Sequence, residues 1–242
     1  MKGVILAGGS GRRLDPLTRI TNKHLLPVYD RPMIYYAIEQ LAGAGIERIM
    51  IVTGGNHAGE FLRLLGNGSS FGLRHLDYAY QDKAGGIAEA LGLAEYFAAG
   101  DSVAVLLGDN IFENSIAPIA ERFRRQATGG RVVLAQVENA SAYGVAVVRD
   151  GRLLQIVEKP ERPPSKLAVT GLYFYDSRVF EIVKSLKPSG RGELEITDVN
   201  NRYLALNELQ HEVLDGYWAD CGESVKMLLR ANNLVAERGA NR

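Results

Sequence analysis

The sequence contains only one cysteine, Cys221, which excludes an intramolecular disulfide. It has no excess of positive charge, because 28 Lys and Arg residues balance 28 Asp and Glu residues, and no basic block could neutralise a row of phosphates. No apolar stretch approaches the ~20 residues that span a bilayer, and the glycine-broken start MKGVILAGG is too short for a signal peptide. We therefore expect a cytoplasmic protein without nucleic-acid or membrane partners.

The pattern along the first 140 residues alternates between strand-length apolar runs and longer segments of helical period. A length of 242 residues, with 46% hydrophobic and 23% charged residues, is typical of one globular α/β unit. The alternation predicts a mostly parallel sheet covered by helices. The predicted strands are Lys2–Ala7, 48–53, His75–Gln81, 102–107 and 132–137. The predicted helices are 32–42, 57–65, 87–97 and 116–126.

After about residue 140 the pattern of apolar runs changes. Residues 144–148 and 153–157 flank Arg149-Asp150-Gly151, and an Asp-Gly pair between apolar strands predicts a β-hairpin. We therefore expect an antiparallel insertion at this point. A strand at 169–175 and helices at 178–186, 193–206 and 224–237 complete the predicted elements.

A glycine-rich loop, Gly8-Gly9-Ser10-Gly11, directly follows the first predicted strand and precedes Arg12-Arg13. Glycines let backbone N–H groups surround phosphate oxygens, and the arginines add positive charge, although a simple tight turn would also explain them. The Walker pattern is absent, and Leu14 stands where a dinucleotide-binding fingerprint needs its third glycine. An NAD-dependent dehydrogenase is therefore disfavoured.

Other candidate site residues are charged groups at the ends of apolar runs. Lys23 could reach the same phosphates as the glycine loop, while Asp109 ends an apolar strand and Asp220 lies among apolar neighbours. Two converging aspartates could hold Mg²⁺ together with substrate phosphates. The pair Glu158-Lys159 could bind a sugar phosphate. Taken singly, each of these residues also has a structural explanation. Lys23 could be a solvated lysine, Asp109 a helix cap, Asp220 a turn residue and the pair Glu158-Lys159 a solvated strand end.

In this order the motifs resemble the sugar nucleotidylyltransferases, and among them the thymidylyltransferases that act on glucose 1-phosphate. The resemblance extends from Met1 to about Gly222. It is carried by KGVILAGGSGRRLDPLT, NKHLLPVYDRPMIYY, LLGDNIF, YGVAVV, EKP, VTGLYFYD and SGRGELEITDVN.

The resemblance implies one domain, 1–242, with a Rossmann-like sheet in a nucleotide-binding part of about 1–140 and a sugar-binding part of about 141–242. It implies Mg²⁺-dependent transfer from dTTP to glucose 1-phosphate, and a homo-oligomer, either dimer or tetramer. The implied nucleotide-binding residues are Leu6, Gly8, Gly9, Ser10, Gly11, Arg12, Arg13, Lys23, Gln81, Gly86 and Asp109. The implied residues that bind the sugar phosphate are Tyr143, Gly144, Glu158, Lys159, Val169 and Arg191. The implied metal ligands are Asp109 and Asp220, and the implied catalytic cations are Arg13, Lys23 and Lys159.

Several departures from the family pattern leave alternatives open. Asp15 replaces an aromatic residue or histidine, His24 a glutamine, Ala84-Gly85-Gly86 a Pro-Asp-Gly turn, and Cys221 a threonine. A UTP- or CTP-dependent enzyme, another hexose 1-phosphate and a catalytically silent nucleotide-sugar sensor are the alternatives. The chain also resembles a short form without the C-terminal helices of a regulatory site, so we expect weak or absent feedback inhibition.

Overall fold

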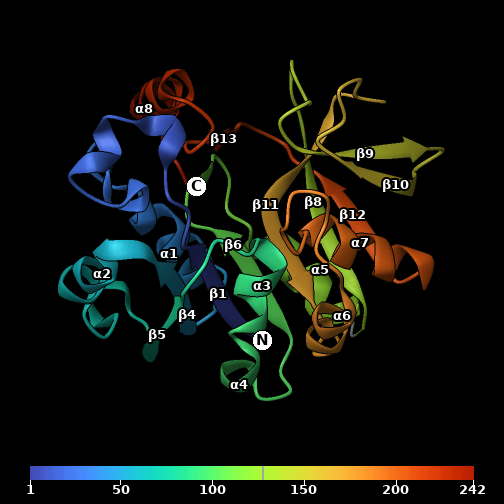
Figure 1. Cartoon of the computed structure of the whole chain (residues 1–242), viewed down its shortest axis with the longest axis horizontal. Helices are drawn as coiled ribbons and strands as arrows, with labels where there is room; N and C mark the ends of the chain where they lie inside the picture. The colour runs from blue at the N-terminus through green and yellow to red at the C-terminus, as the bar shows by residue number, and fades with distance from the viewer. Residues whose placement is uncertain (127) are drawn as a thin grey trace.

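The computed structural model describes residues 1–126 and 128–242, which form a mixed β-sheet with helices on both faces (Figure 1). The strand order is β10-β9-β11-β6-β1-β4-β5, with β8 beside β11 and β12 beside β8. The strands of this sheet are β1 (Lys2–Ala7), β4 (Arg48–Gly54), β5 (His75–Gln81), β6 (Val103–Leu107), β8 (Gly130–Gln136), β9 (Gly144–Arg149), β10 (Arg152–Glu158), β11 (Leu167–Tyr175) and β12 (Leu209–Val213).

Two short ribbons lie outside the main sheet. They pair β2 (Pro27–Val28) with β3 (Arg31–Pro32), and β7 (Asn110–Phe112) with β13 (Trp218–Asp220). The α-helices are α1 (Met33–Gly43), α2 (Ala58–Leu65), α3 (Ile87–Gly92), α4 (Glu95–Ala98), α5 (Ala117–Gln126), α6 (Val179–Ser185), α7 (Ile196–Ala205) and α8 (Val225–Arg238). The 3-10 helices are η1 (Arg12–Leu14), η2 (Leu17–Arg19), η3 (Lys23–Leu25), η4 (Gly55–His57) and η5 (Ser69–Phe71).

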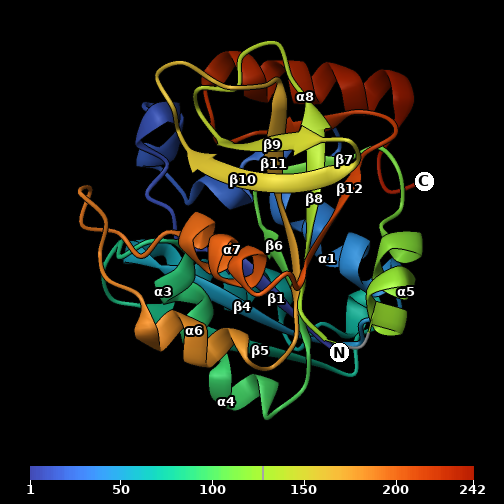
Figure 2. The ribbon, with the colours of Figure 1, turned by 90° about the vertical axis from the view of Figure 1, so that its right-hand side faces the viewer.

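The central strands are buried on both faces, which explains their continuous apolar sequences. In β1, Val4 belongs to the core beneath α3, α4, α6 and α7, whereas Ile5 belongs to the core beneath α1, α2 and α5. Alternate residues of a strand point to opposite faces, so one apolar run supplies both cores. Figure 2 shows α3 and α6 on one side of the sheet and α1 and α5 on the other.

A third core joins the two ends of the chain. It contains Leu14 from the loop after β1, Cys221 after β13, and Leu228, Ala231 and Val235 from α8. Leu14 has no exposed surface in this core. Figure 1 shows α8 beside the blue segment that follows β1, so α8 packs against the loop after the first strand.

The predicted fold class is confirmed: β1 pairs in parallel with β4 and β6, and β4 with β5, while helices cover the sheet. The predicted hairpin is β9–β10, and Asp150 and Gly151 at its tip have φ of 49° and 71°, as its tight turn requires. β11 is antiparallel to β6, β8 and β9. The predicted helix 87–97 is two helices, α3 and α4, and the short strands β2, β3, β7, β12 and β13 were not predicted.

Candidate active site

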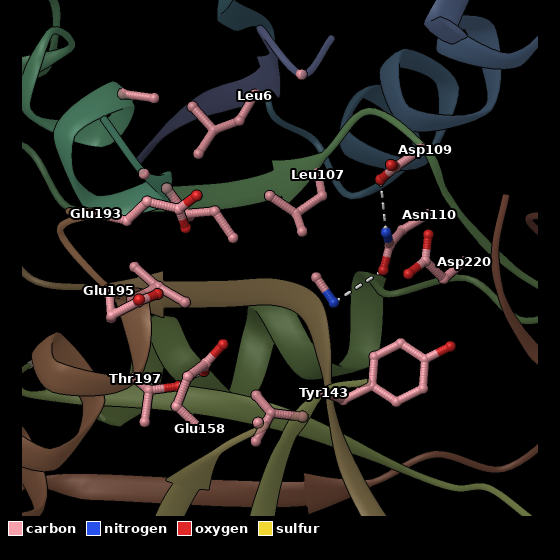
Figure 3. A pocket seen from close by; sticks show the side chains of 18 of the residues that line it. Leu6, Leu107, Asp109, Asn110, Tyr143, Glu158, Glu193, Glu195, Thr197 and Asp220 are labelled. Carbon is pink, nitrogen blue, oxygen red and sulfur yellow. Dashed lines mark hydrogen bonds between the residues drawn. The ribbon is translucent and has the colours of Figure 1, made fainter. Parts of the chain in front are cut away.

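A cavity of about 330 Å³ opens at the carboxyl ends of β1 and β6, and residues of the β9–β10 hairpin in the same sheet also line it. This is the edge where open α/β sheets bind ligands. The sequence-predicted residues that line it are Leu6, Gly8, Gly9, Arg13, Lys23, Gln81, Gly86, Asp109, Tyr143, Gly144, Glu158, Lys159, Val169, Arg191 and Asp220. Figure 3 shows Asp109 and Asp220 at one end of it and Glu158 with Thr197 at the other.

Three predicted residues of the glycine loop, Ser10, Gly11 and Arg12, do not line the cavity. Ser10 and Arg12 are exposed. Gly11 has φ of 66°, and a Cβ there would lie 2.7 Å from Thr18 Cγ2, so its role in this structure is to allow the turn.

The glycines at the start of the loop allow close packing against two polar side chains. A Cβ on Gly8 would lie 2.8 Å from Gln81 Oε1, and a Cβ on Gly9 would lie 3.1 Å from the Lys23 side chain. Arg13 follows in η1 and is exposed, and it has no ion-pair partner among the residues that the structure describes. Its guanidinium is therefore available to an anionic ligand.

Lys23 and Asp109 form a buried ion pair across the cavity wall. Lys23 Nζ donates to Asp109 Oδ2 at 2.5 Å, and the side chains are 11% and 9% exposed. Burial alone would raise the pKa of Asp109, but the charge of Lys23 and hydrogen bonds from Lys23 and Asn110 outweigh it and hold the pKa below its usual value. Asp109 therefore stays a carboxylate.

Asp220 experiences the opposite balance. Burial, and then the negative charge of Asp109, raise its pKa to about 7, although the backbone N–H of Gly222 donates to its Oδ1 at 3.0 Å. The two aspartates therefore repel each other, and a cation between them would relieve that repulsion. Residues 1–126 and 128–242 contain no group of three or more His, Cys, Asp or Glu side chains arranged so that it could hold a metal ion by itself. Mg²⁺ does not need one, because one or two carboxylates suffice when substrate phosphates complete the shell.

The other end of the cavity carries a hydrogen-bonded group of polar side chains. Thr197 Oγ1 donates to Glu158 Oε2 at 2.5 Å, and Arg191 contacts Glu158 at 3.3 Å and Glu195 at 2.7 Å. Lys159 follows at the end of β10 with φ of 38° and a half-exposed side chain. Non-glycine residues with positive φ are uncommon and concentrate at functional sites.

Sequence reasoning missed several lining residues. Asn110 donates to Asp109 (Figure 3). It also accepts from the backbone N–H of Gly171 and from Trp218 Nε1, so it connects β7, β11 and β13. Thr197 was also missed. The signal for Asn110 was its place directly after Asp109, whereas Thr197 gave none, because its contact with Glu158 joins distant segments.

Two of the departures in sequence lie at the cavity: His24 is among its lining residues, and Cys221 is buried next to Asp220. His24 bonds Asn22 Oδ1 through Nδ1 at 2.7 Å, and burial, followed by the charge of Lys23, lowers its pKa to about 3. Burial also raises the pKa of the Cys221 thiol well above its usual value. Both side chains are therefore neutral near pH 7.

Comparison with known proteins decides the family. The family model described as nucleotidyl transferase matches residues 2–238. The chain belongs to this nucleotidyl transferase family. It is 48% identical to the glucose-1-phosphate thymidylyltransferase of an Actinoplanes species over 226 residues, which are 92% of this chain and 74% of that relative. It is 47% identical to the enzyme of that name from Neisseria meningitidis, with 92% and 78% covered.

Solved structures of nucleotidyl transferases have the same architecture. A candidate glucose-1-phosphate thymidylyltransferase from Bacillus anthracis, solved with sucrose, superposes with a TM-score of 0.93 at 50% identity, covering 97% of this chain and 94% of that one. A UDP-glucose pyrophosphorylase solved with UDP-glucose superposes with a TM-score of 0.82 at 26% identity, covering 98% of both chains. Among the described helices, none combines the length and apolarity needed to cross a bilayer.

Proposed function

We propose that this nucleotidyl transferase is a glucose-1-phosphate thymidylyltransferase, which converts dTTP and glucose 1-phosphate to dTDP-glucose and pyrophosphate. The observation that carries the proposal is one cavity lined by Arg13, Lys23 and Lys159 together with Asp109 and Asp220. Three cations and two carboxylates suit two phosphorylated substrates and a divalent metal ion. The names of the relatives that match more than nine-tenths of the chain support the same reaction.

The reaction proposed is a direct in-line displacement. A phosphate oxygen of glucose 1-phosphate attacks the α-phosphorus of dTTP, a new P–O bond forms, and the bond to the β-phosphate bridging oxygen breaks. Pyrophosphate leaves with the electron pair of that bond. The attacking oxygen is already anionic, so the protein must mainly align two repelling anions and stabilise the charge of the leaving group. No activated serine or cysteine is needed.

The charged side chains divide these tasks between the two substrates. Arg13 and Lys23 bind the triphosphate, and Lys159 binds the sugar phosphate. Glu158 accepts hydrogen bonds from sugar hydroxyls. Buried cations act most strongly where water is excluded, and Lys23 is already held in place by Asp109.

Asp109 and Asp220 would hold Mg²⁺. The ion would neutralise charge on the triphosphate and on the leaving pyrophosphate. Burial and the negative charge of Asp109 together raise the pKa of Asp220, and two carboxylates that repel each other in this way suit a site for a divalent cation. We also propose that residues 1–140 and 141–242 are the nucleotide-binding and sugar-binding parts of one domain, and that the protein is a homo-oligomer.

The test is pyrophosphate release from purified protein with Mg²⁺ and glucose 1-phosphate, comparing dTTP, UTP, CTP, ATP and GTP. Release should be strongest with dTTP, and Lys159→Ala and Asp109→Asn should each abolish it. Strongest release with UTP would assign the enzyme to the uridylyltransferases. No release with any nucleotide from folded protein would favour another sugar phosphate or a nucleotide-sugar sensor.

A further inference from the structure

The cavity wall contains Gln81, which the family resemblance implies as a nucleotide-binding residue and whose amide orientation is imposed by its neighbours. Building on the proposed function, we propose that Glu89 is a positioning residue that orients Gln81, so that the pocket selects a pyrimidine with a hydrogen on N3. Thymine and uracil carry that hydrogen, whereas cytosine carries a lone pair there. Glu89 itself does not line the cavity and acts through Gln81.

The orientation of the Gln81 amide follows from hydrogen-bonding chemistry. Gln81 Nε2 lies 2.5 Å from Glu89 Oε2 and 3.4 Å from the carbonyl oxygen of Gly86. A carboxylate and a carbonyl can only accept hydrogen bonds, so only the NH₂ group of the amide can face them. The flipped amide would place its oxygen against a carboxylate oxygen, and the two would repel.

The amide oxygen consequently faces the glycine loop. A Cβ on Gly8 would lie 2.8 Å from Gln81 Oε1, which places this oxygen against the start of the loop that follows β1. Gln81 is 8% exposed, and both Gln81 and Gly8 line the cavity. A fixed acceptor therefore lies at the wall of the pocket, in surroundings where an unmatched polar group is costly.

A fixed acceptor distinguishes between pyrimidines. The N3–H of thymine or uracil can donate to Gln81 Oε1. Cytosine presents an acceptor at N3, so the two lone pairs would repel, and a shifted pose would be needed to use its amino group. A site built to pair with a donor rejects an analogue that lacks it more strongly than a site that depends on shape.

Gly85 provides the space that Glu89 occupies. A Cβ at residue 85 would lie 2.1 Å from Glu89 Oε2, so any side chain there would displace the carboxylate. Gly85 does not have a left-handed backbone, unlike Gly86 with φ of 104°. Alanine is therefore compatible with the backbone at residue 85, and Gly85→Ala should move Glu89 without unfolding the turn.

The experiment measures kcat/KM for dTTP, dUTP and dCTP with glucose 1-phosphate, and dissociation constants for dTTP and dCTP by calorimetry. Wild-type protein should prefer dTTP and dUTP to dCTP. Glu89→Gln keeps the size of the side chain but can either donate or accept, so it no longer imposes one amide orientation. The value of kcat/KM for dTTP divided by that for dCTP should fall about tenfold in Glu89→Gln and in Gly85→Ala. A tenfold change corresponds to the free energy of about one hydrogen bond.

Two comparisons separate positioning from general damage. The double variant Gly85→Ala/Glu89→Gln should show no further fall, because both changes remove the same contact. Glu95→Gln, the same substitution in the next helix, should leave the ratio unchanged. Equal ratios in wild type and both single variants would overturn the inference. Absence of turnover would count against the proposed function only, because the calorimetric ratio still tests the orientation of Gln81.

Discussion

Lys23 and Asp109 lie 86 positions apart in the sequence, and yet Nζ and Oδ2 are 2.5 Å apart in a buried pair. Lys23 begins η3, and Asp109 follows β6. The contact therefore connects the segment after the glycine loop to the carboxyl end of the central sheet. Because both charges are buried, neither side chain can be removed without leaving the other uncompensated.

The first prediction concerns this pair. Lys23→Met should lower the free energy of unfolding by about 3 kcal/mol, because it leaves the Asp109 carboxylate buried without its cation. Pyrophosphate release should fall at least about a hundredfold, as expected when a cation that stabilises developing charge is lost. Urea unfolding and a pyrophosphate assay measure the two effects.

The double variant Lys23→Met/Asp109→Asn serves as the control for that experiment. It removes both charges, so most of the stability should return while activity remains absent. If the double variant were as unstable as Lys23→Met, the uncompensated charge of Asp109 would not be the cause of the lost stability.

The second prediction concerns Gly222, which follows the Asp220 segment. A Cβ at this position would lie 2.2 Å from Asp109 Oδ2 and 2.7 Å from Lys23 Nζ. Gly222→Ala should therefore displace the ion pair, destabilise the protein by about 1–3 kcal/mol and lower kcat about a hundredfold. Gly59→Ala in α2 is the matched control, since its Cβ would meet no atom within 4 Å. That change should stabilise the helix slightly. Full activity of Gly222→Ala would refute the prediction.

The third prediction separates the two substrates. Thr197→Val keeps the shape of the side chain but removes the hydroxyl that donates to Glu158 Oε2. The KM for glucose 1-phosphate should rise about tenfold, and the KM for dTTP should not change. Thr18→Val removes a hydroxyl that donates to the carbonyl oxygen of Gly11 in the glycine loop, so it should raise the KM for dTTP instead. Steady-state kinetics with each substrate varied in turn would show which KM each variant changes. Equal changes in both KM values for either variant would contradict the prediction.

The fourth prediction concerns pH. Burial acts to raise the pKa of Asp176, but hydrogen bonds from Arg178, the Gly129 N–H and Tyr203 outweigh it and lower the pKa below its usual value of 3.8. The carboxylate therefore stabilises the fold above about pH 4, and this contribution is lost as pH falls through the lowered pKa. Asp176→Asn should lower the free energy of unfolding by about 2 kcal/mol at pH 7 and by less at pH 3.

Urea unfolding at both values of pH measures this difference. The matched control is Asp150→Asn at the exposed tip of the β9–β10 hairpin, where φ is 49° and asparagine fits equally well. If Asp176→Asn cost as much at pH 3 as at pH 7, the carboxylate would not be the stabilising group.

The sequence predicted those parts of the fold that have a long periodic pattern. The apolar run of β1, the amphipathic helix α1 and the Asp150-Gly151 turn carry local signals, and the structure has all three. The strands β7 and β13 have three residues each, which is too short for a period to be read. They form because their partners are brought together by the rest of the fold.

The candidate site was predictable as a set of residues but not as a geometry. The motifs indicated Asp109 and Asp220, and no local pattern could show that β7 and β13 bring them to the same cavity. The contact of Thr197 with Glu158 is another tertiary contact, between the start of α7 and the end of β10. Such pairings depend on which surfaces pack together, and sequence position does not encode that locally.

The third core also affects the order in which the protein can become active during its synthesis. Leu14, beside Arg13, is covered by Leu228, Ala231 and Val235 of the last helix, and Asp220 precedes that helix. Chains emerge from the ribosome with the N-terminal end first. The nucleotide loop is therefore made early but stays without its apolar cover until α8, Val225–Arg238, has been translated. A nascent chain would thus complete its triphosphate site more than 200 residues after the glycine loop has been synthesised.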